Sequence, residues 1–326
     1  MNETISTITH KTILFSPLNW GLGHVSRSVP LIQQLINQGN ELIICCNTDQ
    51  EEFYRDYFPF LWFVDHQGYP FDFKGRGEFV KDMLFNYRKL KRRRDKEILE
   101  VKELVKVFTP DLIISDQRFG FRHRQVKSII ISHQLTLKLP FYAQIGQLMN
   151  KVLLKKFDEV WVPDGKENLS GELSQSKIEH KRVGLMSRFD NKLEELPYKY
   201  KYLAVVSGPM PYAKLFLENL CQRLEKVEGK HAVVASLELF DYKTQKDNVE
   251  VYYQPDKEGL ERLFAEAEVV ISRSGYSTLM DLTRLKKKAL LIPTKGQTEQ
   301  EYLAVHNANR KDFEFLSEED FTNYPL

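Results

Sequence analysis

The sequence predicts an α/β protein of two domains, each built on a parallel sheet that helices cover on both faces. Short strands that are apolar along their whole length alternate with helical stretches, which is typical of a doubly covered parallel sheet. The alternation restarts after a polar stretch at 164–201, so we expect domains at 1–187 and 188–326. A chain of 326 residues is long enough for two domains of roughly 150 residues each.

Each element is expected from its local pattern. Runs of β-branched and apolar residues predict strands, and apolar residues three and four positions apart predict helices. In the first domain we expect strands at 11–16, 41–46, 61–64, 111–115, 128–132 and 159–162, with helices at 25–38 and 78–108. In the second we expect strands at 202–207, 231–236, 249–253, 268–272 and 289–293, a weak strand at 313–316, and helices at 213–226, 260–267, 278–285 and 299–310.

Composition excludes several classes of protein. Apolar residues make up 42% and charged residues 28%, a balance that excludes disorder for most of the chain. Lys and Arg number 47 and Asp and Glu 45, and this net charge of +2 argues against a nucleic-acid partner. Three cysteines without a Cys-x-x-Cys pair indicate a reducing compartment. With no apolar leader at the N-terminus and no membrane-spanning run, we expect a soluble, cytoplasmic protein.

The longest predicted helix carries a basic run. Seven of the nine residues from Arg88 to Lys96 are Lys or Arg. The plain interpretation is a solvated helix face, and the alternative is attraction to phosphate on lipid headgroups or on an acidic substrate. The aromatic residues at 71–73 would suit the same lipid surface, so peripheral contact with the inner face of a membrane stays open.

The first strand leads into a glycine-containing turn with a histidine. Gly21 and Gly23 let the backbone approach a ligand, and His24 has the near-neutral pKa of a general base. Asp116 ends a strand on the same edge of the sheet, so a His24–Asp116 dyad is predicted. The alternatives are a histidine that only packs the loop, and an aspartate that caps a helix or pairs with Arg118.

A dinucleotide-binding fingerprint is a weaker interpretation of this turn. Ser26 stands where a third glycine or alanine would pack helix on strand, and no acid closes the second strand. Farther along, His133 ends another strand on the same edge. His133 and Gly21 are candidates for the side of the site that would bind an acceptor substrate, one that receives a transferred group.

Polar residues are dense at strand ends of the second domain. Backbone amides at these turns can hold a diphosphate, hydroxyls and a carboxylate can hold a ribose, and amide and carboxylate groups suit sugar hydroxyls. The alternative is a set of ordinary helix starts with caps. The candidate binding residues are Gly23 in the first domain and Ser207, Gly208, Arg273, Ser274, Gly275, Ser277, Thr278, Asp281, Gln297, Gln300 and Glu301 in the second.

Several cofactor motifs are missing from the sequence. It contains no Asp-x-Asp pair, no zinc-ligand spacing and no GxxxxGK[ST] loop. We therefore expect neither a metal nor a resident cofactor.

Together these residues resemble the GT-B fold glycosyltransferases, most closely the MurG-like family 28 enzymes and their relatives with a GxGHxxR start. The stretches at 21–27 and 272–304 carry the resemblance. It implies two Rossmann-like domains facing a central cleft, and inverting sugar transfer without an essential metal. The acceptor would lie on the first domain and the nucleotide sugar on the second.

The resemblance also assigns roles to residues. His24 matches the loop histidine, Gly275 lies in the diphosphate loop, and Asp281 replaces the usual ribose-binding Glu. Gln300 and Glu301 occupy the paired glutamine positions that contact the donor sugar. The acid at Glu301 points to a donor other than N-acetylglucosamine, and the absence of a GGTGGH loop leaves the acceptor open, lipid-linked or glycan.

The prediction is an inverting, UDP-sugar-dependent glycosyltransferase. His24, oriented by Asp116, would deprotonate the acceptor hydroxyl, while amide groups and Arg273 would stabilise the leaving diphosphate. The first alternative is a nucleotide-sugar hydrolase or epimerase of the same fold, in which His24 would activate water. The second is a binding protein without turnover.

Overall fold

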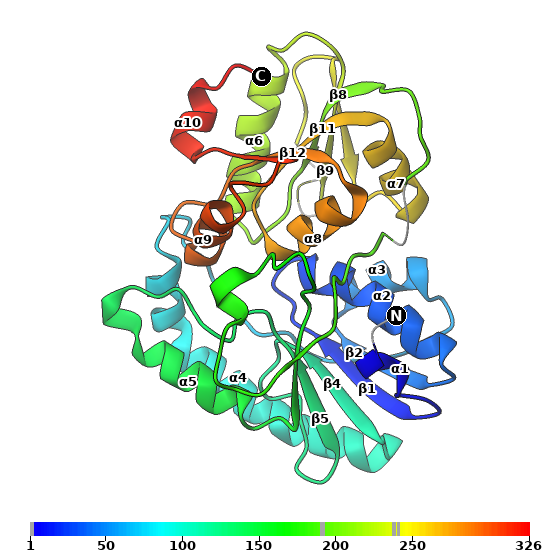
Figure 1. Cartoon of the computed structure of the whole chain (residues 1–326). Helices are drawn as coiled ribbons and strands as arrows, with labels where there is room; N and C mark the ends of the chain where they lie inside the picture. The colour runs from blue at the N-terminus through cyan, green and yellow to red at the C-terminus, as the bar shows by residue number, and fades with distance from the viewer. Residues whose placement is uncertain (1–2, 190–192, 237–238, 240–241) are drawn as a thin grey trace. The chain divides into compact units, whose positions relative to one another are not determined.

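The computed structural model describes residues 3–189, 193–236, 239 and 242–326, and it divides the chain into two compact units (Figure 1). The first unit contains Met1–Asp72 and Val80–Arg188. The second contains Phe189–Leu326 together with a short segment from earlier in the chain, Phe73–Phe79.

The first unit contains a seven-stranded parallel sheet in the order β3-β2-β1-β4-β5-β6-β7. The direction in which the strands are added reverses between β1 and β4, as in Rossmann folds, where ligands bind beyond the carboxyl ends of the strands. The strands are β1 (Thr12–Pro17), β2 (Glu41–Cys46), β3 (Trp62–Asp65), β4 (Leu112–Asp116), β5 (Lys127–Ile131), β6 (Glu159–Val162) and β7 (Lys181–Arg182). The helices are α1 (Glu3–Ser6), α2 (Gly23–Asn37), α3 (Thr48–Tyr57), α4 (Phe79–Phe108), η1 (Phe141–Ala143), α5 (Ile145–Leu154) and η2 (Gly171–Ser174).

Apolar strand residues build the core of this unit. Leu14, Ile43 and Ile113, from three neighbouring strands, form one buried cluster with Val101 of α4. The amphipathic helix α2 buries its apolar positions, including Ile32, and contacts β1 and β2. The strands are therefore apolar along their whole length because helices bury both faces of the sheet, as the sequence pattern predicted.

The second unit repeats the same topology with six strands, in the order β10-β9-β8-β11-β12-β13. Its core joins strand residues to α6 and to Phe321 of α10, so α10 is part of this unit. The strands are β8 (Tyr200–Val205), β9 (His231–Ala235), β10 (Val249–Tyr253), β11 (Ala267–Ser272), β12 (Lys288–Leu291) and β13 (Phe313–Phe315). The helices are α6 (Tyr212–Leu224), α7 (Lys257–Ala265), α8 (Tyr276–Leu285), α9 (Thr298–His306) and α10 (Glu318–Asn323).

The predicted α/β class with two parallel sheets is confirmed. Every predicted strand and helix is present, with ends that shift by a few residues. The sequence pattern missed α1, α3, α5, α10, β7 and the two 3₁₀ turns. The helix α3 illustrates the reason: it is largely polar and begins at a capping box between Asn47 and Gln50, a local polar signal rather than an apolar one.

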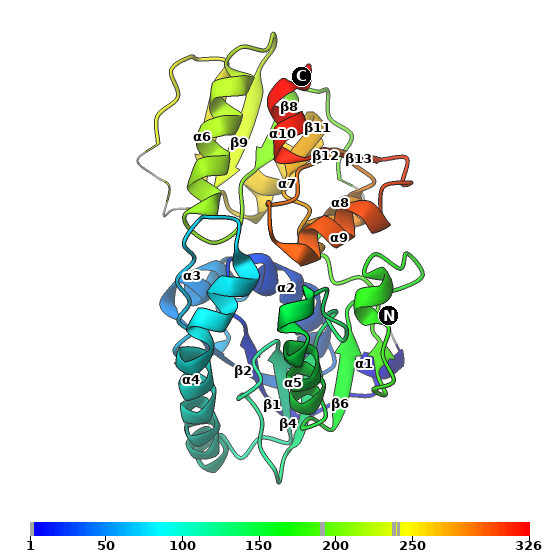
Figure 2. The same cartoon turned by 90° about the vertical axis from the view of Figure 1, so that its left-hand side faces the viewer.

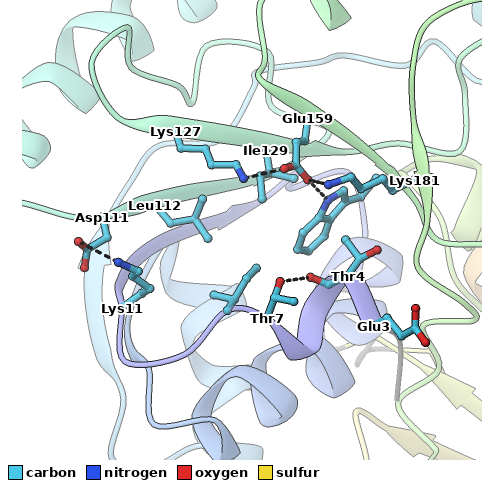
Figure 3. Close-up of a pocket in the computed structure, with 12 residues that line it drawn as sticks. Glu3, Thr4, Thr7, Lys11, Asp111, Leu112, Lys127, Ile129, Glu159 and Lys181 are labelled. Atoms are coloured by element: carbon cyan, nitrogen blue, oxygen red, sulfur yellow. Dashed lines mark hydrogen bonds and ion pairs between the residues drawn. The ribbon is translucent and has the colours of Figure 1, made fainter.

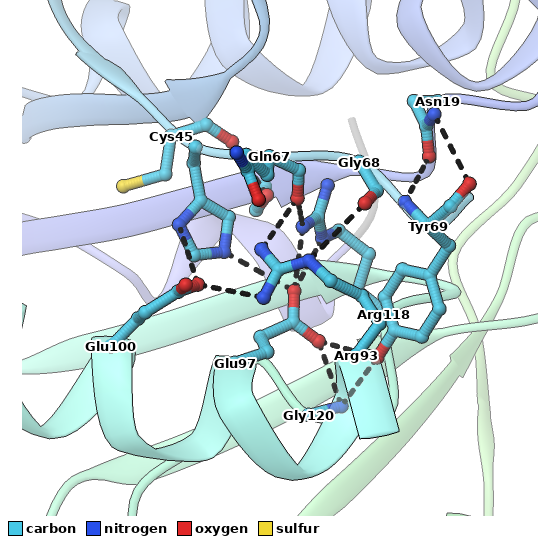
Figure 4. Close-up of polar contacts among 12 residues, drawn as sticks. Asn19, Cys45, Gln67, Gly68, Tyr69, Arg93, Glu97, Glu100, Arg118 and Gly120 are labelled. Carbon is cyan, nitrogen blue, oxygen red and sulfur yellow. Dashed lines mark hydrogen bonds and ion pairs between the residues drawn. The ribbon is translucent and has the colours of Figure 1, made fainter. Parts of the chain in front are cut away.

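A buried polar network holds α4 against the loops of the first sheet (Figure 4). The carboxylate of Glu97 on α4 accepts from Arg118 Nε at 2.7 Å and from the Gly120 amide at 3.1 Å. It also accepts from the Tyr69 hydroxyl, and His66 Nε2 lies 3.2 Å away. Burial alone would raise the pKa of Glu97, but the Arg118 charge and the bonds from His66 and Tyr69 outweigh it and lower the pKa to about 2.

The same network fixes the loop that follows β1. Arg118 Nη1 donates to the Pro17 carbonyl at 3.3 Å. Asn19 Oδ1 accepts from the Tyr69 amide at 2.7 Å, and Trp20 Nε1 donates to the Tyr69 carbonyl at 3.2 Å. Residues 17–20 are thus attached to the buried network just before the turn that carries His24.

Substituting Glu97→Gln should destabilise the protein strongly. The change keeps the shape of the side chain but leaves the fully buried Arg118 without a counter-charge, which costs about 3–5 kcal/mol of the free energy of unfolding. Because the folded-state pKa of Glu97 is depressed to about 2, its contribution is present above the ordinary value near 4.5 and is lost as the pH falls through about 2. Urea unfolding between pH 7 and pH 2 measures both effects.

Glu103→Gln on the same helix is the matched control. Glu103 is exposed and pairs with Lys106 at the surface, so its loss should leave the unfolding midpoint unchanged. Equal midpoints for the two variants would contradict the proposed importance of the buried pair.

Candidate active site

The carboxyl edge of the first sheet brings His24, Arg27 and Asp116 together. Asp116 is the last residue of β4 and lies opposite Pro17, the last residue of β1, in the parallel register. The helix α2 begins at Gly23, so His24 and Arg27 are three residues apart in its first turns and share a face. The expected placement of His24 and Asp116 on one edge is confirmed, at the position where the strand order reverses.

Arg27 forms a two-pronged ion pair with Asp116. Its Nε donates to Oδ2 at 2.8 Å and its Nη2 donates to Oδ1, and both side chains are buried. Burial alone would raise the pKa of Asp116, but the charge of Arg27 and the contact with His24 hold it well below its usual range. Arg118, the alternative partner considered for Asp116, pairs with Glu97 instead.

His24 faces both members of this pair through one nitrogen. Its Nδ1 lies 3.2 Å from Asp116 Oδ1 and 2.9 Å from Arg27 Nη2. With a proton on Nδ1, the ring donates to Asp116 and leaves Nε2 able to accept a proton. With the proton on Nε2, the ring accepts from Arg27 and Nε2 can only donate. Which of these forms is present decides whether His24 can act as a base.

The surroundings of His24 favour the neutral ring. Burial lowers its pKa most, and the charge of Arg27 lowers it further, against the opposing effect of Asp116. About 17% of the side chain is still exposed, so a ligand can reach it. Burial and Arg27 thus disfavour the protonated ring, and the side chain is accessible, as a general base requires.

Arg27 also reaches the histidine assigned to the acceptor side. Its Nη1 lies 3.4 Å from Nδ1 of His133, which follows β5. Gln117 Nε2 donates to the Ser132 hydroxyl at 2.9 Å and ties the two strand ends together. Arg27 is the residue to which sequence reasoning gave no role. The sequence signal for it was its place as the arginine of the GxGHxxR start, three residues after His24. The structure shows that Arg27 is buried, and a buried arginine needs a buried acid as its partner.

The second unit places its candidate residues at the equivalent edge. Ser207 and Gly208 follow β8, and the turn at 273–275 follows β11, the neighbouring strand, with Val205 opposite Ser272. Ser207 and Gly208 are exposed, and Gly275 is the N-cap residue of α8 and has no side chain. Ser277 and Thr278 lie in the first turn of α8, and Asp281 is buried in its second turn.

Hydrogen bonds join this turn to the segment at 294–301. The Ser274 hydroxyl donates to the Gln300 carbonyl at 3.0 Å, and Gln300 Oε1 accepts from the Thr294 amide at 2.9 Å. Glu301 Oε1 accepts from the Gly296 amide at 2.7 Å, and Gln297 is the N-cap residue of α9. The structure thus brings the two predicted binding segments together. The side chains of Ser274, Gln300 and Glu301 already form hydrogen bonds that hold these segments in place.

Arg273 has a different place from the one predicted. Its guanidinium is buried 3.9 Å from the centre of the Phe216 ring and pairs with Glu318 of α10 at 2.6 Å. It also donates to the Ile292 and Pro293 carbonyls at 3.3 and 3.4 Å. The expectation that Arg273 adds charge at a diphosphate is corrected, because its charge is already neutralised inside the unit.

A pocket of about 470 Å³ opens at the other end of the first sheet (Figure 3). It is lined by residues that begin strands, among them Leu112, Lys127 and Lys181. Lys127 and Lys181 both pair with Glu159, at 2.6 and 2.9 Å. Since its lysines pair with Asp111 and Glu159 and it lies at the amino ends of the strands, this pocket is not the candidate site.

The described residues contain neither a cluster of metal ligands nor a membrane-spanning helix. No group of three or more His, Cys, Asp and Glu side chains among them could hold a metal ion. None of the helices in that part of the chain is both long enough and apolar enough to cross a membrane.

Comparison with known proteins gives the fold and a domain family. Residues 222–326 match the glycosyltransferase family 28 C-terminal domain. A solved spinosyn rhamnosyltransferase, complexed with thymidine diphosphate, is similar with a TM-score of 0.66 and 13% identity over 96% of this chain and 88% of that chain. The fold is GT-B. MurG of Acinetobacter baumannii is similar with a TM-score of 0.55 and 13% identity over 97% of this chain and 87% of that chain.

At such low identity the solved structures show the fold, and the domain match adds the family 28 character of the second unit. The comparison with curated proteins found no sequence match. The predicted GT-B fold and the MurG-like resemblance are confirmed, and together they support a glycosyltransferase.

His24 should titrate below the ordinary histidine value of 6.5, because burial and Arg27 both disfavour the imidazolium. Nitrogen-15 NMR of the imidazole rings, with His24→Gln to assign the signal, measures the midpoint and reports which nitrogen carries the proton. A midpoint at or above 6.5 would show that Asp116, rather than burial and Arg27, dominates the surroundings of the ring.

Proposed function

We propose that this protein is an inverting glycosyltransferase that moves a sugar from a nucleoside diphosphate sugar, with UDP as the carrier, to an acceptor hydroxyl. The family 28 domain and the GT-B fold support the reaction class. The observation that carries the mechanism is the position of His24, whose Nδ1 lies 3.2 Å from the buried carboxylate of Asp116.

His24 acts as the general base in this proposal. Nε2 takes the proton of the acceptor hydroxyl while that oxygen bonds to the anomeric carbon. The bond between the anomeric carbon and the diphosphate oxygen breaks, and the nucleoside diphosphate leaves with the electron pair. Asp116 stabilises the imidazolium that forms, through the Nδ1 proton. Arg27 keeps the ring neutral before the reaction and holds the carboxylate in position.

The second unit holds the donor in this proposal. Amide groups at Ser207–Gly208 and in the first turn of α8 bind the diphosphate, and the positive end of the helix dipole stabilises the leaving group without a metal. Asp281 binds the ribose, and Gln297, Gln300 and Glu301 bind the sugar. The complex of the similar rhamnosyltransferase with thymidine diphosphate supports a nucleoside diphosphate as the ligand class.

An acceptor at a membrane surface is part of the proposal. Apolar side chains stand exposed on η1 and α5 and at the start of α4, among them Phe141 with 96% and Phe85 with 75% of its surface exposed. Figure 2 shows α4 and α5 running alongside each other on the first unit. Arg88, Lys91 and Arg92 of the basic run are also exposed. This combination suits the anionic headgroups and outer acyl region of a bilayer.

The structure corrects two details of the expected lipid surface. Within the basic run, Arg93 is buried and bonds the Gln67 carbonyl and Glu100. Among the aromatic residues at 71–73, Phe71 packs against Trp20, and Phe73 packs against Phe79 and Tyr212. The exposed apolar residues of α5, which sequence reasoning did not single out, take their place.

Removing the base should abolish most of the turnover. His24→Ala should lower turnover about 10²–10⁴-fold, the range for a general base, and leave UDP affinity unchanged. Release of UDP from UDP-glucose and UDP-N-acetylglucosamine, with and without acceptor alcohols, measures it. His180→Ala, which removes a histidine whose Nδ1 bonds the carbonyl of Ile178, two residues away, is the control. UDP release that does not depend on acceptor would indicate the hydrolase instead, and a His24 variant within threefold of wild type would remove the base from the mechanism.

Membrane contact is tested separately with vesicles. The double variant Phe141→Ser with Ile145→Ser should weaken binding to phosphatidylglycerol vesicles more than tenfold, because each buried apolar side chain contributes about 1.5–3 kcal/mol. Val305→Ser, which removes another exposed apolar side chain, from the second unit, should have no effect. Cosedimentation measures the partition, and no binding of the wild type would refute the surface.

A further inference from the structure

The segment Phe73–Phe79 comes from the first half of the chain but is built into the second unit. Tyr212, at the start of α6, is its main anchor. The Phe79 ring stacks on Tyr212 with centroids 4.6 Å apart, and Phe73 meets the same ring edge-on at 6.3 Å. The Gly77 amide donates to the Tyr212 hydroxyl at 2.9 Å. Three contacts along seven residues thus fix this segment on α6.

The segment also touches the loops that carry the proposed donor residues. A Cβ at Gly75 would lie 2.6 Å from Cγ of Pro211, in the loop that contains Ser207 and Gly208. A Cβ at Gly296 would collide with the Gly77 carbonyl oxygen, and both glycines have positive φ, +79° and +70°. Only glycine allows this backbone-to-backbone approach. The segment therefore lies against the loop after β8 on one side and the loop after β12 on the other.

Partly buried and exposed residues alternate along the segment. Phe73, Gly75, Gly77 and Phe79 are at least partly buried in the second unit, whereas Lys74, Arg76 and Glu78 are exposed. Lys74 and Glu78 have further interactions within the structure. For Arg76, the described part of the chain supplies no hydrogen bond or ion pair. The anchored backbone thus holds the exposed Arg76 between Gly75, which lies against Pro211, and Gly77, which lies against Gly296.

The charges of the second unit show why such a cation matters. A nucleoside diphosphate carries about two to three negative charges, and further charge develops on it as it leaves. Arg273, the first residue of the turn that follows β11, is paired with Glu318 and buried. Backbone amides alone offer partial charges. A guanidinium adds a full charge and a fork of N–H donors that fits two phosphate oxygens.

We propose that Arg76 binds the diphosphate of the nucleotide sugar, as a residue of the donor site supplied by the first half of the chain. This inference rests on the proposed function. The N–H groups of Arg76 donate to non-bridging phosphate oxygens, so the residue binds the donor and stabilises the leaving group. The glycines at 75, 77 and 296 serve this role because they let the segment lie flat against the donor loops.

Nucleotide affinity tests the assignment. UDP and uridine, with dTDP and thymidine in parallel, are titrated calorimetrically into the full-length wild type and its variants. Arg76→Ala should weaken UDP binding about tenfold or more and leave uridine binding unchanged, because only UDP carries the diphosphate. Arg76→Lys should recover part of the loss. Arg262→Ala on α7, which also removes one exposed arginine from the second unit, should change neither.

The outcomes separate this inference from the proposed function. If the wild type binds neither UDP nor dTDP, the proposed function and the inference fail together. If the wild type binds UDP and Arg76→Ala binds it equally well, the inference alone is overturned. Equal weakening of UDP and uridine would also overturn it, since that result would reflect a change in loop shape. A lower slope of UDP affinity against salt in Arg76→Ala would support it.

Discussion

The buried ion pair between Arg27 and Asp116 is the interaction on which the candidate site depends. Two charges removed from water are costly unless their geometry is good and their remaining hydrogen-bonding groups are used. Here the fork of the guanidinium grips both carboxylate oxygens, and its other N–H groups face His24 and His133. The pair joins the first turns of α2 to the end of β4. The position of His24 is therefore set by the same contact that closes the sheet edge around it.

The two units use one topological solution twice. In each sheet the order of strands reverses beside the first strand, between β1 and β4 and between β8 and β11. The loops that leave these strands diverge on opposite sides of the sheet and leave room for a ligand at its carboxyl edge. At this edge the first unit has titratable side chains, which suit proton transfer. At the same edge the second unit has glycine, serine and helix N-termini, which suit phosphate binding.

The sequence predicted what local pattern controls. Apolar runs predicted both parallel sheets. The glycine-containing turns predicted the loops at the carboxyl edges, including the edge that His24 and Asp116 share. It did not predict which buried charges pair. Arg118 is two residues from Asp116, yet Gln117 has a positive φ of 62° and turns the chain, so that Arg118 reaches Glu97 on α4. Asp116 pairs instead with an arginine 89 residues away.

Two further features were hidden for the same reason. Arg273 follows an apolar strand and comes two residues before Gly275, as a phosphate-binding arginine could. In the structure it instead forms an ion pair with Glu318 and packs on the Phe216 ring. The segment at 73–79 has no apolar periodicity, and its place in the second unit depends on Tyr212 and Gly296, which are more than 130 residues away. Partners of charged and aromatic side chains are chosen by tertiary geometry, and a single sequence does not encode that geometry in a local pattern.

The competition for Nδ1 of His24 has a chemical consequence. Arg27 can only donate and Asp116 can only accept, so the ring pairs with Arg27 when its proton is on Nε2 and with Asp116 when its proton is on Nδ1. An acceptor hydroxyl that donates to Nε2 needs the lone pair there, so its binding selects the form with the proton on Nδ1. That form directs the proton at Asp116, which stabilises the imidazolium as the hydroxyl proton moves. In the proposed mechanism, acceptor binding would thus convert His24 from a partner of Arg27 into a base supported by Asp116.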